Sequence, residues 1–465
     1  MAKKYNRRRI FLKASAHMAL LGSGAAAVNG KLNLIGSALA AQGDYAGLTD
    51  YKALVCVFLY GGSDSFNLFI PSEQTPFNDY QQSRGPLALA QDSLLSDANA
   101  SVRFNPNLPD LRDIYDAGNL AIVRNVGNLI QPVSRTQYQN NPSLIPAELF
   151  AHNHQQEQVQ KSWSSRPTGL VGAGWGGRMA DLLMEANGST QLPTCFSMDN
   201  ANFFQPGNHS VPIAINANRG PQLMPYLDAN ASSLNGGRDA AMEQLLRLST
   251  NHGMENFAAN SYVSARDSSR ALSSVINASP DLGPVAPNNR LASQLRMIAR
   301  MISGREQLGL NRQIFFAGLG GWDTHDNQTP RLISLTQQLN AAFSQFNRDV
   351  ATLGVQNEVT TFTTSDFGRT LTINGDGSDH GWGGHYMVMG GAVNGGQLYG
   401  DWPNYAVGSE DDIGNEGRVI PRMSLNEYGA SLGSWMGLSN SDLPDVFPDL
   451  ANFGPEWQSG YGLFG

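Results

Sequence analysis

The stretch ALVCVFLYGG, residues 53–62, has the pattern of a strand buried inside a parallel sheet. Its first eight residues are apolar without interruption, and two glycines end the run. A strand covered on both faces has such a continuous run, whereas a half-buried strand alternates apolar and polar residues. Three more runs of this kind are residues 120–126, 314–319 and 359–364. We therefore predict at least four strands of one mostly parallel sheet.

Helical patterns lie between and after these runs, at residues 108–117, 175–185, 240–249, 291–302, 332–353 and 425–436. Strands that alternate with helices predict an α/β fold, with helices on both faces of the sheet. Residues 200–290 are rich in Asn, Ser, Gly and Pro and have weak periodicity, which is typical of an insertion or cap. We predict a single α/β domain over residues 41–465.

The first forty residues have the features of an export signal. The stretch NRRRIFLK, residues 6–13, matches a twin-arginine motif, and Ala-Leu-Ala at residues 38–40 fits a cleavage site. The apolar segment between them is interrupted by His17 and by glycines, so it is too short and too polar to cross a bilayer. No later stretch is apolar for long enough. We expect a periplasmic or secreted protein without a membrane span.

The composition narrows the classes of partner. Seven of the 31 basic residues fall in the first forty, which leaves 24 against 39 acidic residues and a net charge of -15. A chain of this charge without Lys/Arg clusters is a poor candidate for nucleic-acid binding. The two cysteines, Cys56 and Cys195, form no disulfide framework, and Cys56 is expected to be a small buried apolar residue. An anionic substrate would need a local positive charge, such as a bound cation.

Acidic and imidazole side chains gather in the loops that follow the predicted strands. Asp323 and His325 are two residues apart, so in an extended segment both side chains point the same way. Because ligands bind at the carboxyl ends of strands in such sheets, we expect these loops to form a metal site. Carboxylates with imidazoles suit zinc or manganese, and carboxylates with amides suit calcium. The ligand candidates are Asp64, Asp323, His325, Asp366, Asp379, His380 and His385.

Each candidate also has a purely structural interpretation. Asp64 could cap a helix that begins at the next residue, and Asp379, beside glycines, could be a turn residue. His152 and His154 form a His-x-His pair without neighbouring acids, and we expect them to start a helix or to contact substrate. The coincidence of ligand-type residues at four strand ends favours a metal site over caps alone.

Beside the twin-arginine start, several short motifs follow one another in a fixed order. They are LYGGSDSFNLFIP at 59–71, Ser-Arg-Thr at 134–136, FAHNHQ at 150–155, GWGGR at 174–178, GWDTHDNQ at 321–328, TSDFGR at 364–369, Asp-His-Gly at 379–381, GDWP at 400–403 and NEYGASLGSW at 426–435. In this order they resemble the exported bacterial proteins of the family called domain of unknown function 1501 (DUF1501), which is similar to the alkaline phosphatase and sulfatase superfamily. The resemblance covers nearly the whole chain and implies an alkaline phosphatase/sulfatase-like α/β fold.

The resemblance also implies roles for individual metal ligands. Asp64 is similar to the ligand after the first strand, and His380 to the final histidine. Asp323 and His325 are similar to an Asp/His pair, although the superfamily spaces that pair more widely. Asp366 stands in a Ser-Asp ligand motif, with Phe367 in place of the second ligand.

A hydroxyl nucleophile is implied as well. Relatives tend to read Arg-Ser-His where this chain reads Arg135, Thr136 and Gln137, so the hydroxyl is kept at Thr136 and the imidazole is replaced. Arg135 or Arg369 could clamp the charged ester oxygens through its fork of donors.

The function implied by these features is an exported, metal-dependent hydrolase of phosphate or sulfate esters, with a small-molecule or polysaccharide substrate. A divalent cation, whether zinc, calcium or manganese, would activate the hydroxyl and neutralise the ester. The alternative is a catalytically inactive, sulfatase-like binding protein for anionic polysaccharide or an envelope partner, which the departures at residues 137 and 367 favour. A structural envelope protein would predict repeats or extended apolar patches, and the sequence has neither.

Overall fold

The computed structural model describes residues 45–164, 172–190, 192–221, 241, 244 and 253–465. The export signal predicted at residues 1–40 lies outside this part of the chain, as does most of the helix predicted at 240–249. No helix in the described part combines the length and the apolar character that crossing a membrane requires.

A nine-stranded sheet forms the centre of the molecule, in the order β11-β5-β10-β9-β1-β8-β6-β7, with β12 beside β5. The four strands predicted from apolar runs are β1, β5, β8 and β9, and β1 lies parallel between β8 and β9. Among the described strands of this sheet, β10 alone runs antiparallel to its neighbours. The predicted mostly parallel sheet is therefore confirmed. The strands are β1 (Lys52–Tyr60), β5 (Leu120–Gly127), β6 (Cys195–Ser197), β7 (Ile213–Ala214), β8 (Arg312–Gly320), β9 (Val359–Ser365), β10 (Gly384–Met389), β11 (Leu398–Tyr399) and β12 (Met423–Ser424).

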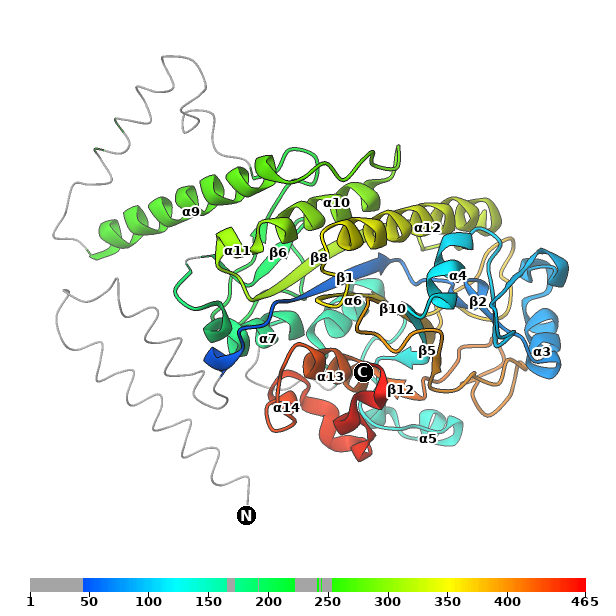
Figure 1. Cartoon of the computed structure of the whole chain (residues 1–465). Helices are drawn as coiled ribbons and strands as arrows, with labels where there is room; N and C mark the ends of the chain where they lie inside the picture. The colour runs from blue at the N-terminus through cyan, green and yellow to red at the C-terminus, as the bar shows by residue number, and fades with distance from the viewer. Residues whose placement is uncertain (1–44, 165–171, 191, 222–240, 242–243, 245–252) are drawn as a thin grey trace.

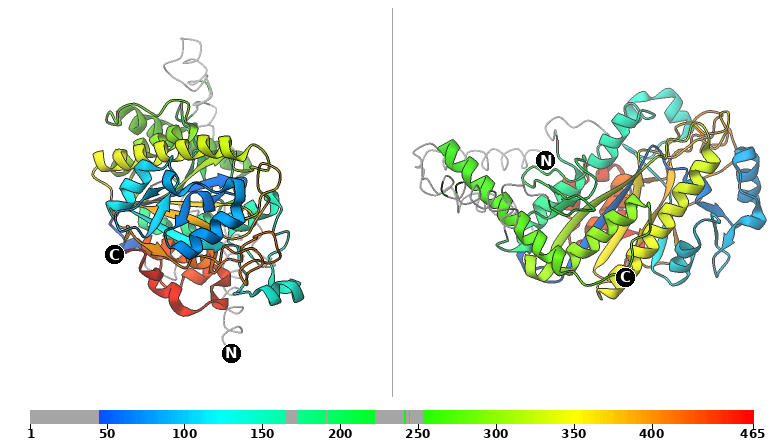
Figure 2. Two further views of the ribbon diagram at one scale, coloured as in Figure 1. Left: turned by 90° about the vertical axis from the view of Figure 1, so that its right-hand side faces the viewer. Right: turned by 90° about the horizontal axis from the view of Figure 1, so that it is seen from above.

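Both faces of the sheet are covered by helices, which explains the continuous apolar runs. In β1, Val55 and Val57 belong to one core and Leu54 and Phe58 to the other, because successive side chains point to opposite faces. The helices α4 (Pro109–Asp116), α10 (Arg290–Ser303) and α12 (Gln328–Thr352) pack in the first core, and α7 (Trp175–Leu183) and α13 (Leu425–Trp435) in the second. Figures 1 and 2 show the sheet between these two layers. Burying each Val, Leu or Phe side chain contributes about 1.5–3 kcal/mol.

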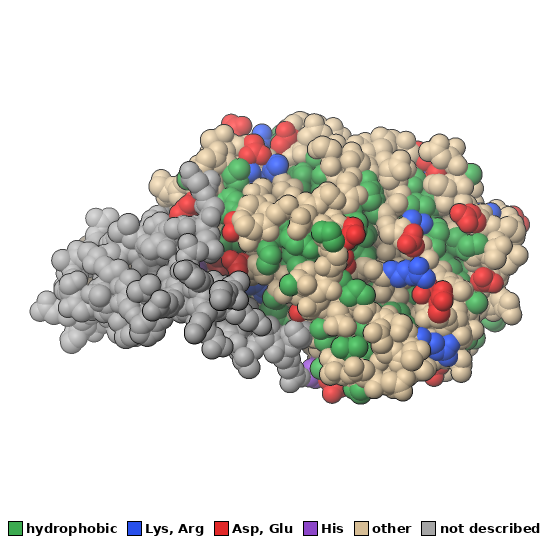
Figure 3. Space-filling view, turned by 90° about the horizontal axis from the view of Figure 1, so that it is seen from below, with side chains coloured by type: hydrophobic (Ala, Val, Ile, Leu, Met, Phe, Trp, Pro, Cys, Tyr) green, Lys and Arg blue, Asp and Glu red, His purple; other side chains and the backbone are tan. Residues whose placement is uncertain are grey.

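Several elements were not expected from the sequence. A small antiparallel sheet of β2 (Phe69–Pro71), β4 (Val102–Phe104) and β3 (Leu95–Ser96) lies beside α3 (Gln74–Arg84) at one end of the molecule (Figure 1). The long helix α9 (Gly253–Ala278) contacts α10 and α11 (Arg305–Leu308) and extends away from the sheet. Acidic and basic side chains are interspersed on the face drawn in Figure 3.

Two glycines end β1 and allow a tight turn towards the site. Gly61 and Gly62 have φ of 114° and 82°, a region that side chains with a Cβ rarely adopt. A Cβ on Gly61 would lie 2.4 Å from the backbone nitrogen of Asp323, and one on Gly62 would lie 2.5 Å from the ring of Phe367. Because these two glycines have no Cβ, the loops after β1, β8 and β9 can approach one another closely.

Candidate metal centre

The ends of the central parallel strands bring distant parts of the chain to one edge of the sheet. Tyr60 of β1 pairs with Gly320 of β8, and Leu59 pairs with Ser365 of β9, so the three strands end side by side. The loop after β8 carries Asp323 and His325, and the residue after β9 is Asp366. His380 comes from the loop that leads into the antiparallel strand β10.

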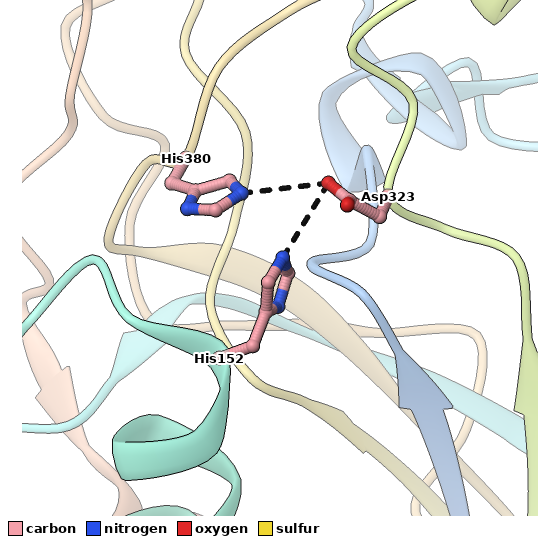
Figure 4. Close-up of side chains that lie close together, drawn as sticks. All are labelled: His152, Asp323 and His380. Atoms are coloured by element: carbon pink, nitrogen blue, oxygen red, sulfur yellow. Dashed lines mark hydrogen bonds and ion pairs between the residues drawn. The ribbon is translucent and has the colours of Figure 1, made fainter.

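Four side chains converge at this edge, and we call them the Asp323 centre: His152, Asp323, His325 and His380. Asp323 Oδ1 lies 3.4 Å from His152 Nε2 and 3.4 Å from His380 Nε2, and ligand atoms of these three residues all fall within 4.8 Å of one another (Figure 4). His325 Nε2 is 3.1 Å from the same oxygen and 2.8 Å from His380 Nε2. Three imidazoles therefore surround one carboxylate oxygen.

The distances between Asp323 Oδ1 and the three ring nitrogens fit those between two ligands of one zinc ion. Zinc bonds nitrogen and oxygen at about 2.0–2.1 Å, so two ligands of a tetrahedral zinc ion lie about 3.3 Å apart. The distances from Asp323 Oδ1 to the three ring nitrogens, 3.1 to 3.4 Å, match that edge length. The distance between His325 and His380 is shorter, at 2.8 Å.

The orientation of the three rings also fits a cation. In each ring Nδ1 contacts a carboxylate or carbonyl oxygen, which only accepts, so Nδ1 carries the proton and a neutral ring has its lone pair on Nε2. Partners of this kind orient the imidazole ligands of metals. Two lone pairs at 2.8 Å repel unless a proton or a cation lies between them. The contacts are His152 Nδ1 to Asp366 Oδ2 at 2.7 Å, His325 Nδ1 to Asp379 Oδ1 at 3.0 Å and His380 Nδ1 to the Phe150 carbonyl at 2.7 Å.

The Nε2 atom of His152 is a buried polar atom without a hydrogen-bond partner among the described residues. Buried polar atoms without partners are rare, and an ion that is missing from a structure is one accepted explanation. The donor set of three imidazoles and one carboxylate suits zinc and similar ions better than calcium, which prefers oxygen ligands. The residues present therefore fit a bound divalent cation.

The electrostatics differ among the members of the centre. The hydrogen bond that His152 donates to Asp366 raises the pKa of His152 above its usual value, against the effect of burial. Burial lowers the pKa of His380, so this ring stays neutral and available as a ligand at neutral pH. Burial alone would raise the pKa of Asp323, but the neighbouring His325 and Arg369 bring it below its usual value.

The helix α6 (His152–Lys161) positions His152 through contacts with Asp366. His152 is its first residue, and Gln156, one turn later, donates from Nε2 to Asp366 Oδ2 at 2.9 Å. Gly61 donates its backbone N–H to the other oxygen of Asp366 at 3.2 Å. Asp366 is thus fully buried and holds His152. The predicted helix start at His152 is confirmed, and its place in the centre had not been predicted.

Three further predicted ligands lie outside the four atoms of the centre. Asp379 holds His325 through Nδ1, and hydrogen bonds from Asn374 and His325 outweigh burial and lower its pKa. Asp64 is buried in an ion pair with Arg84 and makes no helix-cap bond. His385 is buried elsewhere. Its Nδ1 accepts from the Asn125 N–H at 3.1 Å, and its Nε2 lies 2.9 Å from the Tyr405 hydroxyl.

The predicted catalytic residues are placed differently from one another. Thr136 is exposed on α5 (Arg135–Asn140), which lies at the lower edge of Figure 1, apart from α6. Gln137 forms a capping box with Ser134, which accounts for its side chain. Arg135 donates to the carbonyls of residues 408, 409 and 414, so its donors serve the fold. Arg369 is fully buried and donates to Asp323 Oδ1 at 3.1 Å.

Comparisons with known proteins give one family and several similar solved structures, among them a hydrolase and a synthase. The phosphonate monoester hydrolase SpPMH from Silicibacter pomeroyi is 9% identical, and the match covers 85% of this chain and 77% of that one, with a TM-score of 0.38. The lipoteichoic acid synthase LtaP from Listeria monocytogenes is 10% identical, with coverage of 81% and 79% and a TM-score of 0.30. No curated protein matches the chain. The model of the family described as Protein of unknown function (DUF1501) matches residues 51–416, most of the sequence, so the chain belongs to this family.

Proposed function

We propose that the protein is an exported, metal-dependent hydrolase of phosphate or sulfate esters and that the Asp323 centre is its active site. The observation that carries the proposal is the arrangement of three Nε2 atoms around Asp323 Oδ1, with each ring held at Nδ1 by its own acceptor. If these residues served only as helix caps and turn residues, there would be no reason for three imidazoles to surround one carboxylate oxygen.

The chemistry follows from the donor set. A divalent cation held there, zinc in the first place, would lower the pKa of a water or hydroxyl nucleophile and offset the negative charge of the ester. The side chains of Asp323 and His325 are 45% and 42% exposed, so an ester can reach the centre from solvent. His152 and His380 lie deeper, with 29% and 19% exposed, and provide the fixed side of the site.

The identity of the nucleophile is part of the proposal. The resemblance to the family implied Thr136, but that residue lies on the exposed helix α5, and its backbone carbonyl accepts a hydrogen bond from Asn140 Nδ2 at 2.8 Å. We therefore propose that water attacks the ester and that the Thr136 hydroxyl is dispensable. A binding protein for anionic polysaccharide is the alternative, which this position of Thr136 favours.

The test measures bound metal and turnover in the same preparations. We expect a stoichiometric divalent ion by mass spectrometry of the purified protein, and hydrolysis of an aryl phosphate or aryl sulfate that a chelator abolishes. His152→Ala should lose both, whereas His209→Ala, which removes an exposed histidine away from the centre, should lose neither. Thr136→Ala should keep its activity. A metal-free protein that is inert towards both esters but binds an anionic glycan would support the alternative.

Export is tested separately. Replacing Arg8 and Arg9 with lysine in the full chain should leave the protein in the cytoplasm, because the twin-arginine pathway reads that pair. Cell fractionation measures the result. Normal export of this variant would contradict the proposed route and leave the proposed chemistry untouched.

A further inference from the structure

A series of hydrogen-bonded, buried polar side chains runs from Asp64, in the loop after β1, to the Asp323 centre. We propose that Gln328 and Ser378 are positioning residues that set the ion affinity of the centre by fixing Arg369 against Asp323. This inference rests on the proposed function, because it requires that the centre binds an ion. The side-chain hydrogen bonds of both residues go to Asp64, to each other and to Arg369 rather than to the four side chains of the centre, so both would act through Arg369.

The chain of contacts is continuous and inaccessible to solvent. Gln328 donates from Nε2 to Asp64 Oδ2, and Ser378 Oγ donates to Gln328 Oε1 at 2.6 Å. Arg369 donates from Nε to Ser378 Oγ at 3.4 Å and from Nη2 to the Ser378 carbonyl. The four side chains before Asp323 are at most 1% exposed. Water therefore does not replace these partners when one is lost.

Asp64, the first residue of this series, fixes the direction of the hydrogen bonds that Gln328 and Ser378 make. The Asp64 carboxylate, ion-paired with Arg84, can only accept, so the Gln328 amide turns its NH2 group to Asp64 and its carbonyl to Ser378. Ser378 must then donate its single hydroxyl proton to Gln328, which leaves its lone pairs facing Arg369 Nε. The Gln328 amide and the Ser378 hydroxyl each have a partner on both sides, so these two links have one arrangement and hold Arg369 rigidly.

The consequence lies at Asp323 Oδ1. Arg369 Nη1 meets this oxygen at 3.1 Å, the same oxygen that the three imidazoles surround. A guanidinium held by Ser378 orients the carboxylate without moving further into the centre, where its positive charge would compete with an ion. Loss of the hydrogen-bond partners of metal ligands typically weakens metal binding by about 10–100-fold. Because Gln328 acts through two intermediates, we expect an effect near the lower limit.

A second buried glutamine on the helix α12 provides a closely matched control for Gln328. Gln345 also lies on α12, is 3% exposed, accepts from the Ala286 N–H at 2.9 Å and donates to the Ala292 carbonyl at 3.2 Å. It is 17 residues from Gln328, which is about 25 Å along the helix. Gln328→Met and Gln345→Met therefore remove the same groups from comparable buried positions, and only the first faces the centre.

The experiment is zinc titration of the metal-free full chain against a chelating dye. Gln328→Met should bind zinc about 10-fold more weakly than the wild type, Gln345→Met should bind as the wild type, and Ser378→Ala should resemble Gln328→Met. With cobalt in place of zinc, the visible absorption band should shift in Gln328→Met and in Ser378→Ala but not in Gln345→Met. Wild-type zinc affinity in both Gln328→Met and Ser378→Ala would overturn the inference. A wild-type protein that binds no zinc would instead overturn the proposed function.

Discussion

Burial of His385 should make the fold sensitive to acid. The ring is fully enclosed, and its Nδ1 accepts from the Asn125 N–H at 3.1 Å, so Nε2 carries the proton that faces the Tyr405 hydroxyl at 2.9 Å. A second proton on the ring, at Nδ1, would point at the N–H of Asn125, which is fixed in the backbone and also donates. Burial accordingly lowers the pKa of His385 to about 3.

The sign and size of the effect follow from linkage. In the unfolded chain the pKa of a histidine is about 6.5, so below that pH the unfolded state binds a proton that the folded state rejects. Stability from this residue is therefore complete above pH 6.5 and is lost as the pH falls towards 3. At about 1.4 kcal/mol per pH unit, the loss between pH 7 and pH 5 amounts to about 2 kcal/mol.

Urea unfolding of the metal-free protein at pH 7 and pH 5 measures this loss. His385→Asn keeps an acceptor for the Asn125 N–H but cannot titrate, so its free energy of unfolding should fall by about 2 kcal/mol less than that of the wild type between the two pH values. His209→Asn, at an exposed position, should behave as the wild type. An equal acid loss in His385→Asn and the wild type would refute the reasoning.

Three further outcomes are expected. Zinc at 100 times its Kd should stabilise the wild type by about 2.7 kcal/mol in thermal unfolding, and His152→Ala should show no such shift. Arg84→Met leaves the buried Asp64 carboxylate unpaired and should cost about 3–5 kcal/mol in urea unfolding, whereas a surface pair would cost far less. Gly62→Ala forces a side chain onto φ of 82° and should cost about 1–3 kcal/mol, while Gly47→Ala, with open space around it, should be nearly neutral by the same measurement.

The sheet could be predicted because its central strands are buried on both faces. β1 and β8 contain continuous apolar runs, β5 and β9 are rich in apolar and β-branched residues, and each observed strand contains the predicted range. The helix α6 could not be predicted in the same way, because its sequence HNHQQEQVQK has a single apolar residue. Its buried face includes Gln155 and Gln160, which are satisfied by hydrogen bonds, so no apolar periodicity marks it.

The meeting of loops at the sheet edge followed from the sequence, but the selection of residues within them did not. Asp64 follows β1 by four residues and Asp323 follows β8 by three, so the two positions look alike in the sequence. The difference comes from Arg84, twenty residues after Asp64, whose guanidinium reaches the Asp64 carboxylate. His152 was ranked below the other ligand candidates because no acid neighbours it in the sequence, and it begins a helix 25 residues after the end of β5, beyond the loop that the strand-end rule covers.

The division of the aspartates into inner and outer positions determines the charge of the centre. Among the described aspartates, Asp323 alone directs an oxygen at the Nε2 atoms of the three imidazoles. Asp366 and Asp379 contact the opposite ring nitrogens, Nδ1 of His152 and of His325. The outer carboxylates make the rings better donors without adding a ligand charge. With one anionic ligand, a divalent ion would leave the centre positively charged, and the buried Arg369 adds to that charge. Under the proposed function, a chain whose residues 41–465 carry a net charge of -15 would thereby attract an anionic ester to this one place.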